Sequence, residues 1–130
     1  MTASDEFPRP LTSKEREVLD FLLSVEQEGI EALRAQADHV AVISRCKCGC
    51  ASVDFEVDQS CVPASPLPVR RPAIDAESKN REGSVGIFDL MLWADDGWLG
   101  GIELVTYGDE TPPTEFPDMT LFDPPHYTAP

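Results

Sequence analysis

The chain has 130 residues, with 24 acidic against 10 basic side chains and a net charge of −14 at pH 7. A length of this order is typical of one domain, which can bury roughly two-thirds of its unfolded surface without a metal or disulfide. We therefore expect residues 1–130 to form a single domain. Such an acidic surface repels phosphate backbones and anionic lipids, so we expect no nucleic-acid or membrane partner and consider a basic protein partner instead.

Residues 1–10 are polar and contain proline, and they lack the apolar stretch of a secretion signal. We expect this segment to be flexible. The sequence contains no run that approaches the about 18 apolar residues of a membrane span. Both observations predict a cytoplasmic location, where thiols stay reduced, so the four cysteines are not interpreted as two structural disulfides.

Two helices are predicted in the N-terminal third. The first begins at Thr12 or Ser13, because either side chain can cap a helix and Glu15 follows near the positive helix end. The second is short. Apolar residues recur at helical spacing in both segments, at Val18, Leu19, Leu22 and Val25 and then at Ile30, Leu33 and Ala37.

The pattern then changes to that of β-strands. Residues 39–45 are rich in β-branched side chains, and residues 51–57 alternate between apolar and polar, so we predict two strands joined by the cysteine segment. Residues 58–72 contain four prolines and are expected to form a loop. A further short strand is predicted over residues 73–79.

A second hairpin is predicted over residues 85–94 and 98–107, around Asp95-Asp96-Gly97. A three-residue loop with Gly97 in the left-handed conformation places Leu90 opposite Ile102. The same register places Phe88 opposite Leu104, which gives one consistent apolar face.

Three side-chain features of this hairpin bear on function or shape. Its register sets Asp89 across from Glu103, a pair that could serve acid–base or metal chemistry but is more simply a solvated outer face. Gly100-Gly101 indicates a bulge in the second strand. Trp93 and Trp98 flank the turn and are expected to anchor one hairpin end.

Residues 108–130 are rich in proline and acid but carry apolar side chains that a solvated tail does not need. We expect an extended segment that lies on the body at least as far as Phe122. The predicted fold class is α+β, with two N-terminal helices packed on one face of a four- to five-stranded antiparallel sheet built from hairpins, followed by this extended segment.

The strongest chemical signal is a cysteine cluster. Cys46, Cys48 and Cys50 fall within five residues, and Cys61 lies eleven residues further on. Thiolates are soft metal ligands and nucleophiles. A straight strand would hold neighbouring cysteine Cα atoms about 6.5–7 Å apart, which is too far for one zinc ion to collect all three sulfurs easily.

A turn through the cluster removes that difficulty, and two registers fit. A three-residue loop with Gly49 in the left-handed slot makes Cys46 face Cys50 and pairs Ile43 with Val53. A four-residue loop instead pairs Val42 with Phe55 and Val40 with Val57. Both registers bury apolar side chains, so the sequence does not decide which face of the hairpin holds the sulfurs.

Three interpretations of the cluster compete. The cysteines could be small, partly buried residues at a hairpin end. Cys46, Cys48 and Cys50, with Cys61 or His39, could bind zinc, although C-x-C-x-C lacks the spacing of common zinc knuckles. A Cys46–Cys50 or Cys48–Cys61 pair could also form reversibly, since neighbouring cations stabilise a thiolate.

The chain resembles a family of short bacterial proteins, chiefly actinobacterial. The resemblance is carried by Arg45-Cys46-x-Cys48-Gly49-Cys50 and by a second motif from Glu103 to Pro117, Glu103-Leu104-Val105-x-Tyr107-Gly108-Asp109-x-x-Pro112-x-x-x-Phe116-Pro117. That family carries no assigned activity, so the resemblance implies a bacterial source and no function.

The sequence contains no complete catalytic motif. The preferred hypothesis is therefore a non-enzymatic protein-binding module, with the C-terminal segment and the Trp93/Trp98 hairpin end as its contact surface and a basic protein as its partner. The alternatives are a small zinc-binding domain that uses Cys46, Cys48 and Cys50, and a thiol-redox or other enzyme.

Overall fold

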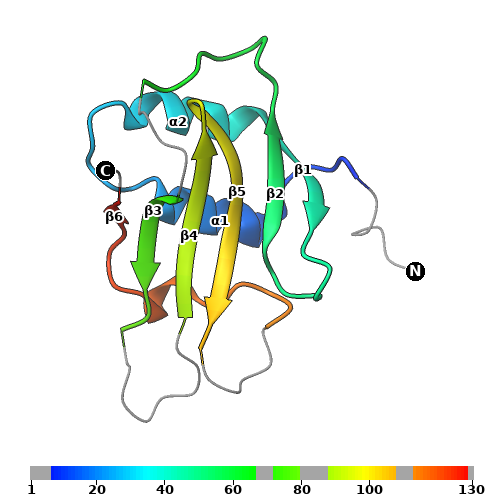
Figure 1. The fold of residues 1–130 in the computed structure, drawn as a ribbon, viewed down its shortest axis with the longest axis vertical. Helices are drawn as coiled ribbons and strands as arrows, with labels where there is room; N and C mark the ends of the chain where they lie inside the picture. The colour runs from blue at the N-terminus through cyan, green and yellow to red at the C-terminus, as the bar shows by residue number, and fades with distance from the viewer. Residues whose placement is uncertain (1–6, 67–71, 80–87, 108–112, 129–130) are drawn as a thin grey trace.

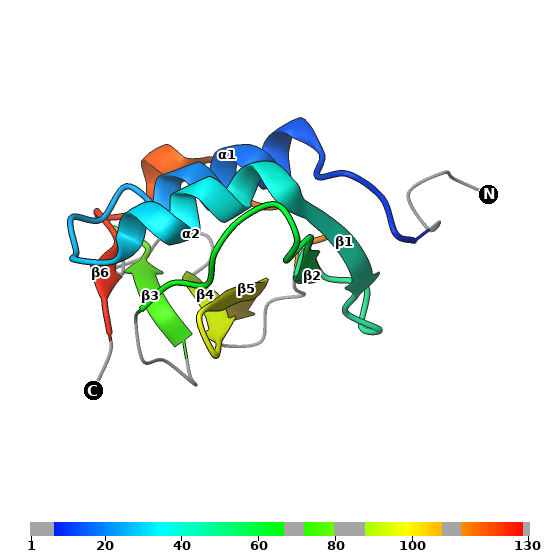
Figure 2. The same ribbon diagram turned by 90° about the horizontal axis from the view of Figure 1, so that it is seen from above.

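The computed structural model describes residues 7–66, 72–79, 88–107 and 113–128. It has an α+β fold in which two helices cover one face of an antiparallel sheet (Figures 1 and 2). The helices are α1 (Ser13–Leu22) and α2 (Ile30–Gln36), and short 3₁₀ turns follow at η2 (Ala37–His39) and η3 (Met119–Leu121). The strands are β1 (Val40–Arg45), β2 (Val53–Val57), β3 (Pro72–Glu77), β4 (Phe88–Asp95), β5 (Trp98–Thr106) and β6 (His126–Tyr127).

The sheet has the strand order β1-β2-β5-β4-β3-β6. Six strands are therefore present where the sequence predicts four or five, because the C-terminal segment adds β6 beside β3. The two predicted hairpins, β1–β2 and β4–β5, are joined edge to edge where Val53 pairs with Ile102. This junction places the cysteine segment next to the middle strands of the sheet.

The start of α1 follows its sequence signal. The Thr12 hydroxyl accepts the Glu15 N–H at 3.1 Å, and Glu15 accepts the Thr12 N–H at 2.9 Å, so the two residues form a capping box. Glu15 also accepts two hydrogen bonds from Arg9 at 2.8 and 2.9 Å. The backbone of Arg9 pairs with Val42 on the free edge of β1. The described end of the segment predicted to be flexible is thus held in place, and residues 1–6 lie outside the described residues.

The core lies between the helices and one face of the sheet. Strand alternation sends every second side chain toward the helices, where apolar residues from both layers are fully buried. These include Val18, Leu19, Leu22, Ile30, Leu33, Val42, Ile74, Leu90, Leu92 and Ile102. Within the described part of the chain, no helix covers the opposite face of the sheet, as the view from above shows (Figure 2).

The β4–β5 hairpin differs from its predicted register. Its loop has two residues, Asp96 and Gly97, with φ of 53° and 88°, and Leu90 pairs with Leu104 instead of Ile102. Asp-Gly is a favoured pair for such a turn, because aspartate tolerates a positive φ and glycine adopts one freely. The register shifts by one residue between Trp93 and Ala94, which confirms the predicted bulge at Gly100-Gly101.

The described part of the C-terminal segment packs against the body, as predicted. Phe116, Met119 and Phe122 are buried, and the Phe122 ring lies 6.4 Å from the rings of both Phe21 and Phe88. These apolar side chains belong to the core, so they do not offer the contact surface that the sequence suggests for this segment. Residues 108–112 of that segment lie outside the described residues.

Candidate metal centre

The β1–β2 hairpin carries the cysteine cluster at its turn. Val40 pairs with Val57 and Val42 with Phe55, which is the register of the four-residue loop. An extra residue, Ile43, then shifts the pairing by one. The strand pairing next to the turn therefore follows neither of the two predicted registers.

This bulge changes what faces the first cysteine. The Cys46 N–H donates to the Ser52 carbonyl at 3.1 Å, so Cys46 lies opposite Ser52 and not opposite Cys50. The loop is longer than either prediction allowed, and it has room to turn back on itself. The prediction that Cys46 and Cys50 face each other across the strands is wrong, because the bulge is not visible in the apolar pattern.

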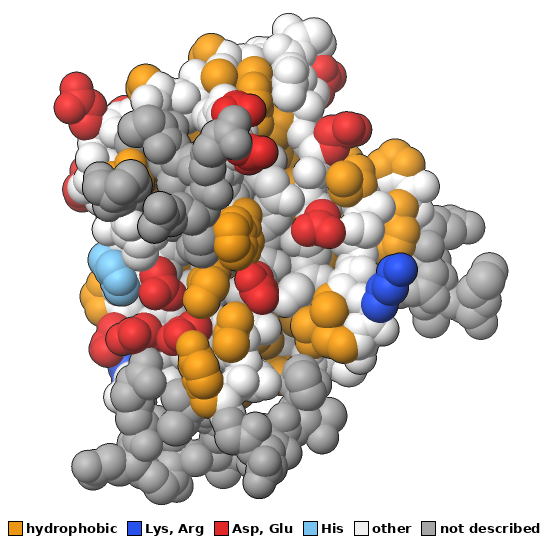
Figure 3. Space-filling model, in the orientation of Figure 1, with side chains coloured by type: hydrophobic (Ala, Val, Ile, Leu, Met, Phe, Trp, Pro, Cys, Tyr) orange, Lys and Arg blue, Asp and Glu red, His pale blue; other side chains and the backbone are white. Residues whose placement is uncertain are grey.

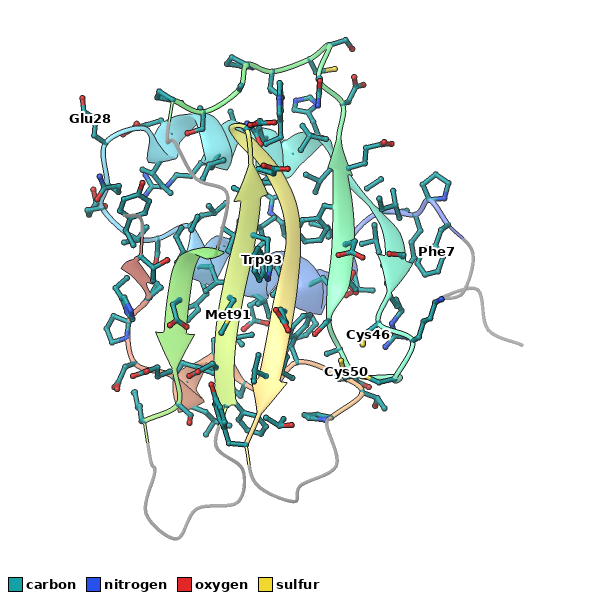
Figure 4. All side chains as sticks on the ribbon, viewed as in Figure 1. Phe7, Glu28, Cys46, Cys50, Met91 and Trp93 are labelled. Carbon is teal, nitrogen blue, oxygen red and sulfur yellow. The ribbon has the colours of Figure 1, made fainter. Side chains whose placement is uncertain are left out.

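A tight turn folds the three sulfurs toward one another. The Gly49 N–H donates to the Cys46 carbonyl at 3.1 Å, and Gly49 takes the left-handed conformation expected of it, with φ of 91°. The Sγ atoms of Cys46, Cys48 and Cys50 all lie within 4.8 Å of one another. The sulfurs of Cys46 and Cys48 are 2.9 Å apart. Figure 4 shows Cys46 and Cys50 at this end of the hairpin.

Neighbouring donors are arranged around these sulfurs. The Cys50 N–H donates to the Cys48 sulfur at 3.4 Å. The Cys50 sulfur lies 3.4 Å from the Ser52 hydroxyl oxygen, which itself accepts the Leu104 N–H at 2.8 Å. In the structure the Cys50 thiol donates to this hydroxyl, and once Cys50 loses its proton to bind a metal the hydroxyl can donate its own O–H to the thiolate. Such outer partners orient metal-binding side chains and stabilise their charged form.

The cluster is open on one side. Cys46 and Cys48 are exposed, whereas Cys50 is only 5 % exposed. The three cysteines line a hollow of about 430 Å³ together with Ser52 and, from β5, Glu103. A metal held by the sulfurs would therefore have a free position for water or an external ligand.

Cys61 does not join this group. It lies past the opposite end of β2, where its exposed thiol donates to the Asp58 carboxylate at 3.4 Å. His39 is also at that end, since its carbonyl accepts the Asp58 N–H. The structure thus brings three of the four predicted ligands together and leaves the fourth apart. The predicted Cys48–Cys61 pair is likewise separated.

The other sequence candidates do not form a shared site. Asp89 pairs with Val105 and Glu103 with Met91, so the two carboxylates are offset and the predicted facing pair is wrong. Asp89 accepts the Tyr107 hydroxyl at 2.5 Å, and Glu103 accepts the Trp93 indole N–H at 3.1 Å.

Ser52 was missed by sequence reasoning, because a serine beside a strand is common and gives no distinguishing signal. Arg45 was expected only as one of the neighbouring cations that stabilise a thiolate. Arg45 lies next to the cluster in the sequence, and its guanidinium donates to the carbonyls of Cys50 at 3.4 Å and Thr114 at 3.2 Å. The turn is therefore tied to the C-terminal segment, a contact that only the tertiary fold creates.

Comparison of the chain with protein-family models, with curated proteins and with solved structures finds no match. Among the described residues, no helix is long and apolar enough to cross a membrane. Within the same part of the chain, Cys46, Cys48 and Cys50 are the one group of three or more potential metal ligands that converge. The chemistry of these three cysteines is therefore the best guide to what the protein does.

Proposed function

We propose that the protein is a small zinc-binding domain in which Cys46, Cys48 and Cys50 are the ligands. The observation that carries the proposal is the convergence of three sulfurs from one short turn, all within 4.8 Å of one another. Thiolates are preferred ligands of zinc and other soft metal ions, and three of them supply a negative charge that offsets the charge of the ion.

The distances between the three cysteine sulfurs are close to those that a zinc ion requires. Zn–S bonds of about 2.3 Å at tetrahedral angles hold the sulfurs about 3.8 Å apart. The Cys46 and Cys48 sulfurs, 2.9 Å apart, would have to separate by about 0.9 Å, and the widest pair would close by no more than about 1 Å. Rotations about the side-chain bonds of two exposed cysteines can supply such movements without changing the strands.

Three ligands leave the fourth tetrahedral position for a group outside the cluster. Cys61 lies past the opposite end of β2 and cannot supply this fourth ligand, whereas the hollow beside the sulfurs admits water. A bound ion would crosslink Cys46, at the end of β1, to Cys50, just before β2. We therefore expect zinc to stabilise this hairpin end, since binding to the folded state adds to folding free energy.

The proposal is tested by metal analysis and thiol counting on the full chain purified without a chelator. We expect about one zinc per chain and protection of three of the four free cysteines from a thiol reagent. Cys50→Ser should lose the metal, and the matched change Cys61→Ser should keep it.

Two outcomes would overturn the zinc site. One is no retained or added zinc, with all four thiols reactive in the folded protein. The other is that two of the four thiols react with the reagent only after a reductant is added, which would favour a Cys46–Cys48 disulfide. The 2.9 Å sulfur separation is the observation that makes this redox outcome worth measuring.

A further inference from the structure

The sheet face opposite the helices provides a second site, which borders the hollow beside the cysteines at Asp54, Trp93 and Glu103. Helices α1 and α2 cover one face only, and the other is turned toward the viewer in Figure 1. Because successive side chains of a strand point to opposite faces, every strand side chain that does not point into the core lies on this open face. An antiparallel sheet tolerates water on one face, so the composition of this face decides whether it is merely solvated.

The open face is strongly acidic. Its strands contribute seven carboxylates, and among the described strand residues the only lysine or arginine is Arg45, whose guanidinium is bonded to the carbonyls of Cys50 and Thr114. The seven carboxylates are Asp54 and Glu56 of β2, Asp75 and Glu77 of β3, Asp89 and Asp95 of β4 and Glu103 of β5.

Four of the seven cations of the described residues lie on the helical side, and the others, Arg45, Lys47 and Lys79, lie at strand ends or in the cysteine turn. All five ion pairs in this part of the chain belong to Arg9, Lys14, Arg16 or Arg34, on the helical side, and none includes Asp54, Glu56, Asp75 or Glu103. The negative charge of the open face is thus not neutralised by these basic side chains. The field over this face is that of a surface suited to a cationic partner.

An apolar strip runs between the carboxylates. Met91 and Val105 are half-buried, and Trp93 is 37 % exposed. Met91 and Trp93 lie on the open face in Figure 4, and Figure 3 shows hydrophobic side chains between acidic ones on it. The Trp93 indole is held in place by its bond to Glu103. A fixed aromatic side chain surrounded by charge is typical of the residues that anchor protein interfaces.

Asp75 supplies a further sign of an incomplete site. One of its carboxylate oxygens is buried and has no hydrogen-bond partner. Burial first, and the nearby charge of Asp89 second, raise the pKa of Asp75, while His126 opposes this effect. A buried carboxylate oxygen without a donor is costly, and the positive charge of an incoming arginine or lysine would lower that cost.

We propose that this open face docks a basic protein surface, with Trp93 and Met91 contacting its apolar side chains and Asp54, Asp75 and Glu103 contacting its arginine or lysine side chains. The inference goes beyond the zinc site and depends on none of its ligands. A second copy of this chain does not fit, because two surfaces of the same charge repel each other. Nucleic acid and anionic lipid are disfavoured for the same reason.

The test uses a short synthetic peptide built from arginine-leucine-arginine repeats, with a glutamine-for-arginine peptide as the neutral probe. Three binding proteins are compared by calorimetry: wild type, an open-face triple variant (Asp54→Asn, Asp75→Asn, Glu103→Gln) and a helical-side triple variant (Glu17→Gln, Glu28→Gln, Glu31→Gln). Both variants lose the same charge, and the amide oxygens retain the ability to accept hydrogen bonds. Circular dichroism checks that each variant is folded.

We expect the open-face variant to bind the arginine peptide about tenfold more weakly, since three ion pairs, each of modest strength at a protein surface, are lost. The helical-side variant should change affinity less than about twofold, and the Trp93 indole resonance should shift on titration. Equal losses in the two variants would show attraction by bulk charge and overturn the proposal. So would absence of binding, equal binding of the neutral peptide, or self-association of the protein through this face.

Discussion

The Cys50 sulfur lies 3.4 Å from the Ser52 hydroxyl, and that hydroxyl oxygen accepts the Leu104 N–H from β5. This chain of contacts connects the cysteine turn to the middle of the sheet. It orients the one buried sulfur of the cluster before any metal binds. Preorganisation of this kind is what an outer partner contributes to a metal site.

Ser52→Ala should weaken zinc affinity by about tenfold, because partners of this type are typically worth 10–100-fold. The expected reason is the loss of the hydroxyl donor to the Cys50 thiolate. Competition with a chromophoric zinc chelator measures the affinity. Ser60→Ala is the matched control, because Ser60 is exposed and bonds Asp58 instead. An unchanged zinc affinity in Ser52→Ala would show that Ser52 only supports the backbone of Leu104.

The ion pair at the start of α1 predicts a pH-dependent stability. Burial disfavours the charge of Glu15, but hydrogen bonds from Arg9 and Thr12 outweigh it and hold the pKa of Glu15 below its ordinary value. A lowered pKa stabilises the fold above the unfolded value, and this contribution is lost as the pH falls through the folded value.

Glu15→Gln should therefore lower the free energy of unfolding by about 1 kcal/mol at pH 7, with the difference shrinking as the pH falls below about 4. Urea denaturation at both pH values measures it. Glu17→Gln is the control, since Glu17 is exposed and its Lys14 contact is long at 3.7 Å. A loss in Glu15→Gln that is the same at both pH values would contradict a role for the charge.

Two glycines in turns should respond differently to alanine. A Cβ on Gly49 would meet nothing within 4 Å, whereas a Cβ on Gly97 would lie 2.4 Å from the Ser65 carbonyl oxygen. Both have a positive φ, which costs an alanine about 1–2 kcal/mol. Gly97→Ala should lose a further 1–3 kcal/mol, roughly, because Ser65 and its loop neighbours must move. Thermal melts of the two variants compare them, and equal losses would contradict the close approach.

Gln36 should be needed for stability, although it lies far from the cysteines. Its buried amide donates to the carbonyls of Gly97 at 2.8 Å and Pro63 at 3.1 Å and accepts the Leu99 N–H at 2.9 Å. Gln36→Met preserves the volume but leaves these groups without partners, so we expect a loss of about 2–3 kcal/mol. The exposed Gln59→Met is the control in urea denaturation. A near-neutral Gln36→Met would mean that water replaces the amide.

Much of the fold could be predicted from local patterns. The capping box at Thr12 and the alternation in β2 are encoded in neighbouring residues, so α1 and β2 follow directly from the sequence. The β4–β5 register could not, because two-residue and three-residue turns both fit Asp95-Asp96-Gly97 and the bulge near Gly100 absorbs the difference. Strand β6 has two residues, and only its pairing with β3 defines it.

Part of the candidate site could be predicted from the sequence. The cysteine spacing and Gly49 together predict a turn that gathers sulfurs, and the structure brings Cys46, Cys48 and Cys50 together. The extra residue at Ile43 decides that Cys46 faces Ser52, and no periodicity reveals one inserted residue. The place of Cys61 depends on the direction of the chain after β2, which a proline-rich segment does not specify.

Zinc K-edge X-ray absorption of the zinc-loaded full chain tests the central claim most directly, because it counts the sulfur atoms bound to the metal. We predict three sulfurs at about 2.3 Å and one lighter ligand, unchanged in Cys61→Ser, whereas Cys50→Ser should retain no zinc to measure. A shell of oxygen and nitrogen alone, or one that loses a sulfur in Cys61→Ser, would contradict a centre built from Cys46, Cys48 and Cys50.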